Sequence, residues 1–430
     1  MKKILQILLY ISAKIVLARY TPDVIGVTGS VGKTSAKEAI ALVLSSRYTV
    51  RQSEKNYNNE IGVPLTIIGS GSGNRSIIGW IGVFTKAICL MLFKDAKYPQ
   101  VLILEMGADR PGDIEYLTRL APCTIGVLTA IGPAHLEKFG TMEKLIHEKQ
   151  AIVRHLRGKD RWAVMTADDP FIFSSKDSFS VPSITFGFKE GADIFVAEWQ
   201  QKAVFLPDDK ETIHSVITVN YKNVIKQIEI NTVGKQAVYS MLPALAIGFL
   251  YHIPFDELAI ILRSYQQPKG RMRFLPGIKH TLIIDDSYNS SPLATRAALD
   301  VLGTFEINEE ARRIVILGDM LELGKYTESE HSEIGVYATN THAVDILICV
   351  GLLALEIAKG ARRAGFDENK IFCFNDAVSA RKTVQTFIKK GDVILVKGSQ
   401  GIRLERIVKE IMAEPEHAEE LLVRQGDEWE

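Results

Sequence analysis

Short apolar runs alternate with segments of helical periodicity along most of the chain. Four runs are nearly continuous in apolar residues, and they stand at 24–28, 101–106, 124–129 and 161–166. Such runs are typical of parallel strands that are covered on both faces. The segments between them predict helices at 34–46, 112–120 and 141–156. This part of the chain therefore predicts an α/β domain with a mostly parallel sheet.

The pattern changes between about 183 and 232, where strands alternate without helices, as at 193–199 and 224–232. This texture predicts a small antiparallel flank on the main sheet. Two helices are expected after it, at 234–251 and 255–264.

A second series of strands and helices follows a cluster of turn-forming residues at 266–270. Strands are expected at 281–286, 313–318, 345–350, 371–374 and 392–397. Helices are expected at 291–303, 328–340, 354–364, 376–389 and 402–412. The pattern predicts a second open, Rossmann-like α/β domain. The expected domains are a basic amphipathic helix at 1–21, a central domain at 22–267, a C-terminal domain at 268–412 and a solvated acidic tail at 413–430.

Two apolar stretches are candidates for contact with a membrane. Residues 4–18 are too short to span, and 77–93 approach that length but carry Lys86. Residues 1–20, which include the first stretch, have four cations and no acid, with apolar residues at positions 4, 8, 11 and 15. This stripe is expected to be buried against the central domain, a partner or a membrane surface. The alternative to peripheral membrane contact is that the two helices cover each other.

Composition narrows the classes of function. Basic and acidic residues both number 51, so no overall field attracts nucleic acid. The four cysteines are scattered and form no CxxC pair, which argues against a zinc ribbon and a redox motif. Each lies in an apolar run, and buried free thiols in a reducing cytoplasm are expected at Cys89, Cys123, Cys349 and Cys373.

The segment TGSVGKT lies directly after the first predicted strand and opens a helix, which is the context of a phosphate-binding loop. Gly29 and Gly32 let the backbone turn its N–H groups toward phosphates. Lys33 is expected to neutralise the β- and γ-phosphates, and the Thr34 hydroxyl to bind Mg²⁺. The generic phosphate-loop motif has a further glycine at the position of Val27. Because this chain lacks that glycine, the assignment depends on the shorter TGSVGKT form alone.

Other polar residues at predicted strand ends have two interpretations each. Glu105 ends an apolar strand. It is interpreted either as a magnesium ligand or as an acid that caps a helix or faces solvent. His135 is a ligand for a second magnesium or an ordinary loop residue, and Lys149 by itself is a surface lysine. Of Asp285 and Asp286, at most one faces a crevice, because adjacent strand residues point to opposite faces.

The chain resembles the Mur ligases of bacterial cell-wall synthesis, and most closely the branch that adds D-alanyl-D-alanine. The segments that carry the resemblance are VIGVTGSVGKTS, NYNNEIGVP, LEMGADRPG, HLEKFG, KGRM, DDSYNSSP, LGDMLELG and VKGSQGIR. The resemblance implies an ATP-dependent ligase that joins a carboxylate and an amine through an acyl phosphate, with ATP and Mg²⁺ as cofactors. It implies a peptidoglycan-precursor peptide and an amino acid or dipeptide as substrates. A monomer without nucleic-acid partners is expected.

The same resemblance assigns roles to particular residues. Nucleotide binding is implied for Gly29, Ser30, Val31, Gly32, Lys33, Thr34, Ser35, Arg271, Asp286 and Asn289. The metal ligands implied are Thr34, Glu105, His135 and a carbamylated Lys149. The catalytic residues implied are Lys33, Glu105, His135 and Lys149. Contacts with substrate are expected from Asn58, Asn59, Lys397 and Ser399.

Two departures from the family pattern stand out. Only about twenty residues precede the P-loop strand, so the family's UDP-binding N-terminal domain is expected to be missing. Ala237 and Ser240 stand where the family usually has asparagines against adenine. There are two alternatives to the implied function. One is a Mur-like ligase for another carboxylate and amine, and the other is a non-catalytic Mur-like partner in a cell-wall complex.

Overall fold

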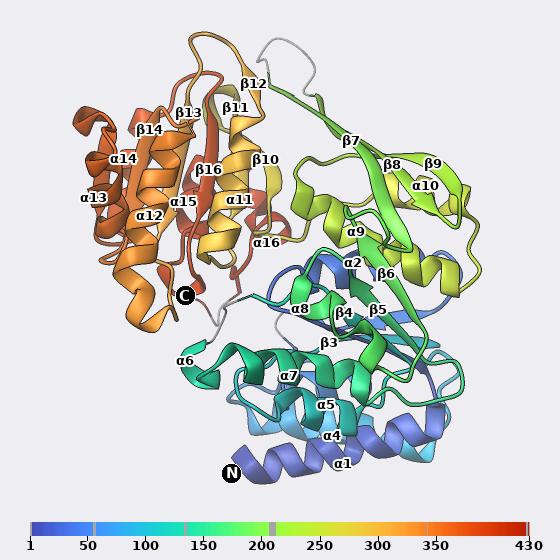
Figure 1. The fold of residues 1–430 in the computed structure, drawn as a ribbon. Coiled ribbons are helices and arrows are strands. Elements are labelled where there is room, and N and C mark those ends of the chain that lie inside the picture. Colours follow the sequence, from blue (N-terminus) through green and yellow to red (C-terminus); the bar gives the residue numbers. More distant parts are fainter. Residues whose placement is uncertain are drawn as a thin grey trace. The chain divides into compact units, whose positions relative to one another are not determined.

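The computed structural model describes residues 2–54, 57–132, 136–205, 212–341, 343–426 and 429. The chain forms two compact units, and each is described by itself (Figure 1). The first unit comprises 1–199, 217–229 and 238–265. The second comprises 200–216, 230–237 and 266–430.

The larger sheet has the strand order β2-β3-β1-β4-β5-β6-β7-β8-β9, and β12 pairs with β7. Its strands are β1 (Asp23–Thr28), β2 (Val50–Gln52), β3 (Val101–Glu105), β4 (Ile125–Leu128), β5 (Trp162–Thr166), β6 (Ser183–Gly187), β7 (Ile194–Phe205), β8 (Thr212–Tyr221), β9 (Val224–Ile230) and β12 (Glu306–Ile307). The four predicted apolar runs are β1, β3, β4 and β5. Strand β1 pairs in parallel with both β3 and β4. The predicted mostly parallel sheet is therefore confirmed.

The flank of this sheet contains a tight hairpin between β8 and β9. Only Lys222 and Asn223 connect the two strands, and both have positive φ, at 50° and 65°. A two-residue turn with both φ values positive matches the twist of an antiparallel hairpin. The small antiparallel flank predicted from the alternating pattern is therefore present.

Helices cover the larger sheet and extend beyond it. They are α1 (Lys2–Tyr20), α2 (Lys33–Leu44), α3 (Gly62–Ile68), α4 (Ile77–Leu92), α5 (Asp113–Leu120), α6 (Leu136–Phe139), α7 (Met142–Arg154), α8 (Pro170–Phe173), α9 (Lys235–Leu250) and α10 (Phe255–Arg263). Helices α2 and α7 pack on β1, which places the beginning of α2 directly at the carboxyl end of that strand. No helix in the described residues is both long enough and apolar enough to cross a bilayer.

The second unit is built on a sheet with the order β10-β11-β16-β13-β14-β15. Its strands are β10 (Arg273–Gly277), β11 (Thr281–Asp286), β13 (Arg313–Gly318), β14 (Ile346–Val350), β15 (Ile371–Phe374) and β16 (Val393–Lys397). Its helices are α11 (Pro292–Gly303), α12 (Thr327–Asn340), α13 (Leu355–Arg363), α14 (Ala377–Phe387), α15 (Glu405–Ile411) and α16 (Ala418–Leu421). Two separate apolar clusters form, one on each face of the sheet, as expected for an open α/β domain. Only β10 is antiparallel to its neighbour, and it was not predicted.

Two expectations about exposure are wrong. The tail is not simply solvated, because Ala418 and Leu422 are buried within an apolar cluster of the second unit. Cys89 and Cys373 are exposed, whereas Cys123 and Cys349 are buried as expected. Cys89 lies on the outward face of α4, and Cys373 lies on β15, which is an edge strand of its sheet.

The expected apolar stripe of α1 is not buried against the central domain, so a partner or a membrane surface is left as its expected contact. The stripe at positions 4, 8, 11 and 15 faces outward, with 45–64% of each side chain exposed. A different stripe is buried, formed by Leu9, Ala13 and Val16, because these residues pack into the core of the first unit with α3 and α4. The helix therefore has apolar residues on both its inner and its outer face.

Candidate active site

The P-loop connects the end of β1 to the beginning of α2. Gly32 has φ 83°, a left-handed conformation that favours glycine. At Gly29 a Cβ atom would lie 2.1 Å from the Thr129 Oγ1 atom, so no larger residue fits. The Lys33 ammonium donates to the Gly29 carbonyl at 2.7 Å, which folds the side chain back over the loop. This geometry leaves a cradle of the kind that binds phosphate.

The loop after β4 holds the P-loop in place. The Ser30 amide donates to the Ala130 carbonyl at 2.7 Å, and the Thr129 hydroxyl donates to the Val31 carbonyl at 2.6 Å. Asp169 in turn accepts a hydrogen bond from the Ile131 amide at 2.6 Å. Sequence reasoning missed Thr129 and Asp169, because their role depends on two distant loops meeting at the ends of neighbouring parallel strands.

Thr34 and Glu105 meet at the carboxyl end of the sheet, as their positions after adjacent parallel strands suggest. The Thr34 hydroxyl donates to Glu105 Oε2 at 2.9 Å, and the Asn58 side-chain amide donates to Glu105 Oε1 at 3.3 Å. Glu105 is only 5% exposed, and its own amide donates to the Ser53 hydroxyl at 3.1 Å. A hydroxyl and a carboxylate beside a phosphate cradle are donors that suit Mg²⁺, which takes its remaining ligands from water and phosphate.

Lys149 lies on α7 and is 2% exposed, so it is not the surface lysine of the simplest interpretation. Burial lowers the pKa of its ammonium to about 7, and the nearby positive charge of Lys33 acts in the same direction. Its neighbour Glu148 has both carboxylate oxygens engaged, by the amides of Gly112 at 2.7 Å and Ile114 at 2.6 Å. The structure thus brings Lys149 close to the P-loop lysine in a buried setting.

The remaining predicted residues of the first unit lie as follows. His135 lies outside the described residues. Within the described part of the chain, no group of three or more histidine, cysteine, aspartate or glutamate side chains is arranged to hold a metal. Asn59 uses its side-chain oxygen to accept from the Ile61 and Gly62 amides, which shapes the start of α3. The Ser35 carbonyl accepts a hydrogen bond from the Tyr265 hydroxyl at 3.0 Å.

In the second unit, Asp286 and Lys397 lie at the ends of two adjacent parallel strands and form a buried ion pair of 2.6 Å. Lys397 also donates to the Asn289 carbonyl at 3.0 Å, and Asp286 accepts from the Met272 amide at 3.1 Å. The structure thereby brings together the predicted site residues Asp286, Asn289 and Lys397. Burial raises the pKa of Asp286, and the ammonium of Lys397 opposes this shift.

Asp285 is completely buried, like its neighbour, but has a different environment. One carboxylate oxygen accepts from the Ser287 amide at 3.1 Å, and the other has no hydrogen-bond partner among the described residues. Burial raises the pKa of Asp285 to about 6. The expectation that at most one of the two acids faces a crevice remains compatible with this arrangement, because Asp286 alone reaches Lys397.

The segment that follows Asp286 is fixed by Arg424, which was not predicted, and by Arg271, which was. Arg424, in the tail, donates to the Ser287 carbonyl at 2.7 Å and the Tyr288 carbonyl at 3.1 Å. It also pairs with the fully buried Glu405 at 2.8 Å. Arg271 stacks on the Tyr288 ring at 4.1 Å. No sequence signal marked Arg424, because the two carbonyls that it holds, those of Ser287 and Tyr288, lie more than a hundred residues earlier in the chain.

Ser399, another predicted site residue, serves the framework in this structure. The Ser399 hydroxyl accepts from the Leu321 amide at 2.9 Å and is nearly buried. Ala237 and Ser240 are both buried on α9.

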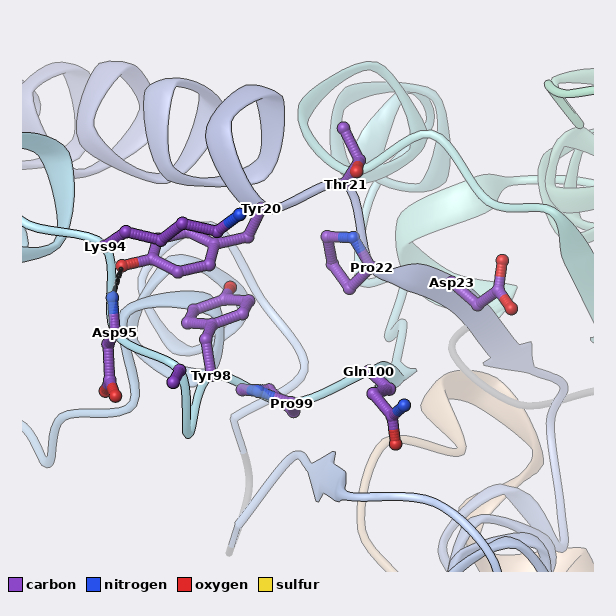
Figure 2. Close-up of a pocket in the computed structure, with 10 residues that line it drawn as sticks. Tyr20, Thr21, Pro22, Asp23, Lys94, Asp95, Tyr98, Pro99 and Gln100 are labelled. Carbon is purple, nitrogen blue, oxygen red and sulfur yellow. Dashed lines mark hydrogen bonds between the residues drawn. The ribbon is translucent and has the colours of Figure 1, made fainter.

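A pocket of about 340 Å³ lies at the opposite end of β1 from the P-loop (Figure 2). It is lined by Tyr20, Asp23, Lys94, Asp95 and Tyr98, among others. None of the predicted site residues lines it. This pocket therefore does not mark the active site, which lies at the carboxyl ends of the strands, where parallel α/β sheets bind ligands.

A P-loop, a carboxylate at the end of the neighbouring strand and a second open α/β unit define a nucleotide-dependent α/β enzyme. Two family models match the chain. The Mur ligase middle domain matches 27–72 and 86–248, and the Mur ligase, glutamate ligase domain matches 270–400. The chain belongs to the Mur ligase family, as its motifs predicted. It is an ATP-dependent ligase that forms a C–N bond, and its cofactors are ATP and Mg²⁺.

Named relatives agree with this assignment. The UDP-N-acetylmuramoyl-tripeptide–D-alanyl-D-alanine ligase of Bacillus subtilis is 28% identical over 403 residues, which cover 94% of this chain and 79% of that protein. The enzyme of the same name from Synechocystis is 28% identical and covers 92% of this chain and 76% of its own length.

Solved structures agree as well. The MurF ligase of Thermotoga maritima in complex with ADP has a TM-score of 0.75 at 27% identity, covering 94% of this chain and 82% of that one. A pseudomurein peptide ligase type C from Methanothermus fervidus has a TM-score of 0.61 at 17% identity, over 90% of this chain and 79% of that one. This second likeness concerns the fold alone.

Proposed function

We propose that this enzyme joins D-alanyl-D-alanine, or a similar amine, to the carboxylate of a peptidoglycan-precursor peptide. The observation that carries the proposal is the Thr34–Glu105 pair beside the Lys33 ammonium, in a chain whose relatives are named for this reaction. The site holds a phosphate cradle and oxygen donors, and both are needed for phosphoryl transfer to a carboxylate. We place the reaction in the cytoplasm and expect a monomer.

The reaction has two steps. A carboxylate oxygen of the peptide attacks the γ-phosphorus of ATP, ADP leaves, and an acyl phosphate forms. The amine nitrogen of the incoming dipeptide then attacks the carbonyl carbon, inorganic phosphate leaves, and the nitrogen loses a proton. Both steps develop negative charge on phosphate oxygens, so fixed positive charge and oriented N–H groups stabilise their transition states.

Each residue of the first unit has a proposed part in these steps. Lys33 lies over the P-loop and neutralises phosphate charge, while the loop amides orient the phosphates. Thr34 and Glu105 hold magnesium, which supplies charge neutralisation on the β- and γ-phosphates when it is bound. Asn58 fixes the orientation of the Glu105 carboxylate by its hydrogen bond at 3.3 Å. His135 is proposed as a further ligand by its position in the family motif alone.

Lys149 is proposed to act as a carbamate. A buried amine with a pKa of about 7 has a much larger neutral fraction near pH 7 than an ordinary lysine, and only a neutral amine reacts with carbon dioxide. The amine nitrogen forms a bond to the carbon of CO₂ and releases one proton. The product is a carbamate, which offers an anionic oxygen ligand to a metal where the lysine had a cation. This carbamate lies near Lys33. In the second unit, Arg271, Asp286 and Asn289 are proposed as ATP contacts, and Lys397 and Ser399 as substrate contacts.

The decisive test is phosphate release with a panel of peptidoglycan-precursor peptides and amines, measured with purified full-length protein. We expect the fastest release when a tripeptide precursor and D-alanyl-D-alanine are both present, slower release when a single amino acid replaces the dipeptide, and none when the peptide or the amine is left out. Lys33→Ala should abolish release while the circular dichroism spectrum stays unchanged. Lys144→Ala, at an exposed position on α7, is the matched control and should keep full activity.

Two results would contradict the proposal. Undiminished release by Lys33→Ala would exclude the P-loop as the phosphate site. Release that depends on another carboxylate and another amine would retain the ligase chemistry but exclude the proposed substrates.

A further inference from the structure

The described residues concentrate their exposed apolar side chains on one pair of helices. Eleven of the 21 exposed large hydrophobic residues lie on α1 and α4 or directly after α4. They are Ile4, Ile7, Leu8, Ile11, Ile15, Ile77, Ile78, Ile81, Ile88, Leu92 and Phe93. Soluble proteins rarely expose so much apolar surface in one region without a partner.

The spacing shows that these residues form stripes rather than scattered exposures. On α1 the exposed positions 4, 7, 8, 11 and 15 follow one face of a helix, and the buried Leu9, Ala13 and Val16 follow the opposite face. On α4 the exposed positions 77, 78, 81, 88 and 92 also share a face, while Val83, Ala87 and Leu90 are buried. Each helix is therefore anchored by its inner stripe and presents a second stripe outward.

The two helices are fastened to each other as well as to the core (Figure 1). At the end of α1, Arg19 donates to the Leu92 carbonyl at 3.3 Å, and the Tyr20 hydroxyl donates to the Phe93 carbonyl at 3.0 Å. The Tyr20 ring stacks on Tyr98 at 4.0 Å, as Figure 2 shows. The two stripes therefore belong to one fixed surface, here called the α1–α4 surface, rather than to a loose end of the chain.

The charges around this surface are mostly positive. Neither α1 nor α4 contains an acidic residue. Exposed cations stand on both helices and in the loop after α4, at Lys3, Lys14, Arg19, Lys86, Lys94 and Lys97, and that loop adds one acid, Asp95. Apolar stripes bordered by lysine and arginine are the pattern of helices that lie in the interface of an anionic bilayer.

We propose that the α1–α4 surface binds peripherally to membranes that contain anionic phospholipid. The two helices, about 28 Å and 24 Å long at the usual rise per residue, lie along the bilayer with their outer stripes among the acyl chains and their cations at the headgroups. Neither helix qualifies as a membrane span. A second copy of the chain is a poorer occupant, because a twofold interface would bring like cations together. The proposal stands independently of the substrates proposed above.

The test uses full-length protein and vesicles of phosphatidylcholine with or without phosphatidylglycerol. We expect sedimentation with the phosphatidylglycerol vesicles at low salt, and weaker binding to phosphatidylcholine alone or at high salt. Ile7→Glu/Ile81→Glu should lower the partition coefficient about tenfold or more, because both side chains are exposed and would enter the interface. Lys3→Gln/Lys14→Gln should weaken binding only to the anionic vesicles.

The matched control is Ile225→Glu/Ile260→Glu, which changes two equally exposed isoleucines elsewhere in the first unit and should bind like the wild type. Phosphate release in solution should be the same for every variant, so this test is separate from that of the ligase function. Absence of vesicle binding at low salt would overturn the proposal. So would a dimer in light scattering that Ile7→Glu/Ile81→Glu converts to monomer, because the surface would then be a self-association interface.

Discussion

Each of the two units buries a lysine near its predicted site, but the two lysines have different partners. Lys397 ends β16 and pairs with Asp286 on the adjacent strand at 2.6 Å. Lys149 lies on a helix, next to another cation, and its neighbour Glu148 is occupied by two backbone amides. Both side chains are 2% exposed, so the difference lies in their partners rather than in burial.

This difference separates a framework charge from a reactive amine. A paired and hydrogen-bonded ammonium stays charged and fixes the two strand ends that hold it. A buried lysine beside a second cation loses its proton more easily, because desolvation and repulsion both disfavour the charged form. The burial of Lys149 beside Lys33 and its pKa of about 7 therefore suit the proposed reaction with carbon dioxide, whereas the ion pair of Lys397 fixes the strand ends at the proposed substrate contact.

The largest effect is expected at Lys149. Lys149→Ala should lower phosphate release about 100-fold or more, because it removes the proposed anionic ligand beside the phosphates. Formate or acetate should restore part of the activity by replacing the carbamate. Lys144→Ala, an exposed position on the same helix, serves as the control. Near-normal phosphate release by Lys149→Ala would exclude the carbamate role and leave Lys149 as a buried lysine of the helix.

A smaller effect, on stability rather than chemistry, is expected at the ion pair of the second unit. Lys397→Met should lower the free energy of unfolding by about 3–5 kcal/mol, because it leaves the Asp286 carboxylate buried without its cation. The double variant Asp286→Asn/Lys397→Met should recover much of this loss. Urea denaturation of both single variants and the double variant gives the coupling energy.

The control for this pair is Lys359→Met, which removes an exposed ion pair with Glu356 on α13. It should change the free energy of unfolding by less than about 1 kcal/mol. Equal losses at Lys359 and Lys397 would mean that burial does not distinguish the two pairs.

The smallest effect is expected at Asp285, which is buried like Asp286 but lacks its lysine. Its folded-state pKa of about 6 lies above the ordinary value of 3.8. The folded state therefore holds more protons than the unfolded state between pH 3.8 and 6, and stability falls as the pH rises through this window. Removal of the charge in Asp285→Asn should stabilise the protein at pH 7 by up to about 3 kcal/mol, and the gain should vanish toward pH 4.

Thermal unfolding across this pH range measures the effect. Glu309→Gln, at an exposed position of the same unit, should show no such pH-dependent gain. A gain in Asp285→Asn that is the same at pH 4 and pH 7 would exclude titration as its cause.

The order of strands and helices could be predicted from the sequence because the apolar runs of covered parallel strands are continuous and strongly β-branched. The predicted run 281–286 corresponds residue for residue to β11. Elements with little apolar content of their own escaped prediction, such as β10, an edge strand that contains Pro276, and the three-residue β2. Their conformation comes from pairing with a neighbour that the sequence does not specify.

By itself, the sequence determined the P-loop and the family, because TGSVGKT and its neighbouring motifs are local and contiguous. Only the tertiary structure decided which residues meet, since contacts such as Thr34 with Glu105 or Arg424 with Ser287 join positions 71 and 137 residues apart. It also decided which stripe of α1 is buried. A helix with apolar residues on two faces offers either one to the core, and the choice is made by packing against α3 and α4.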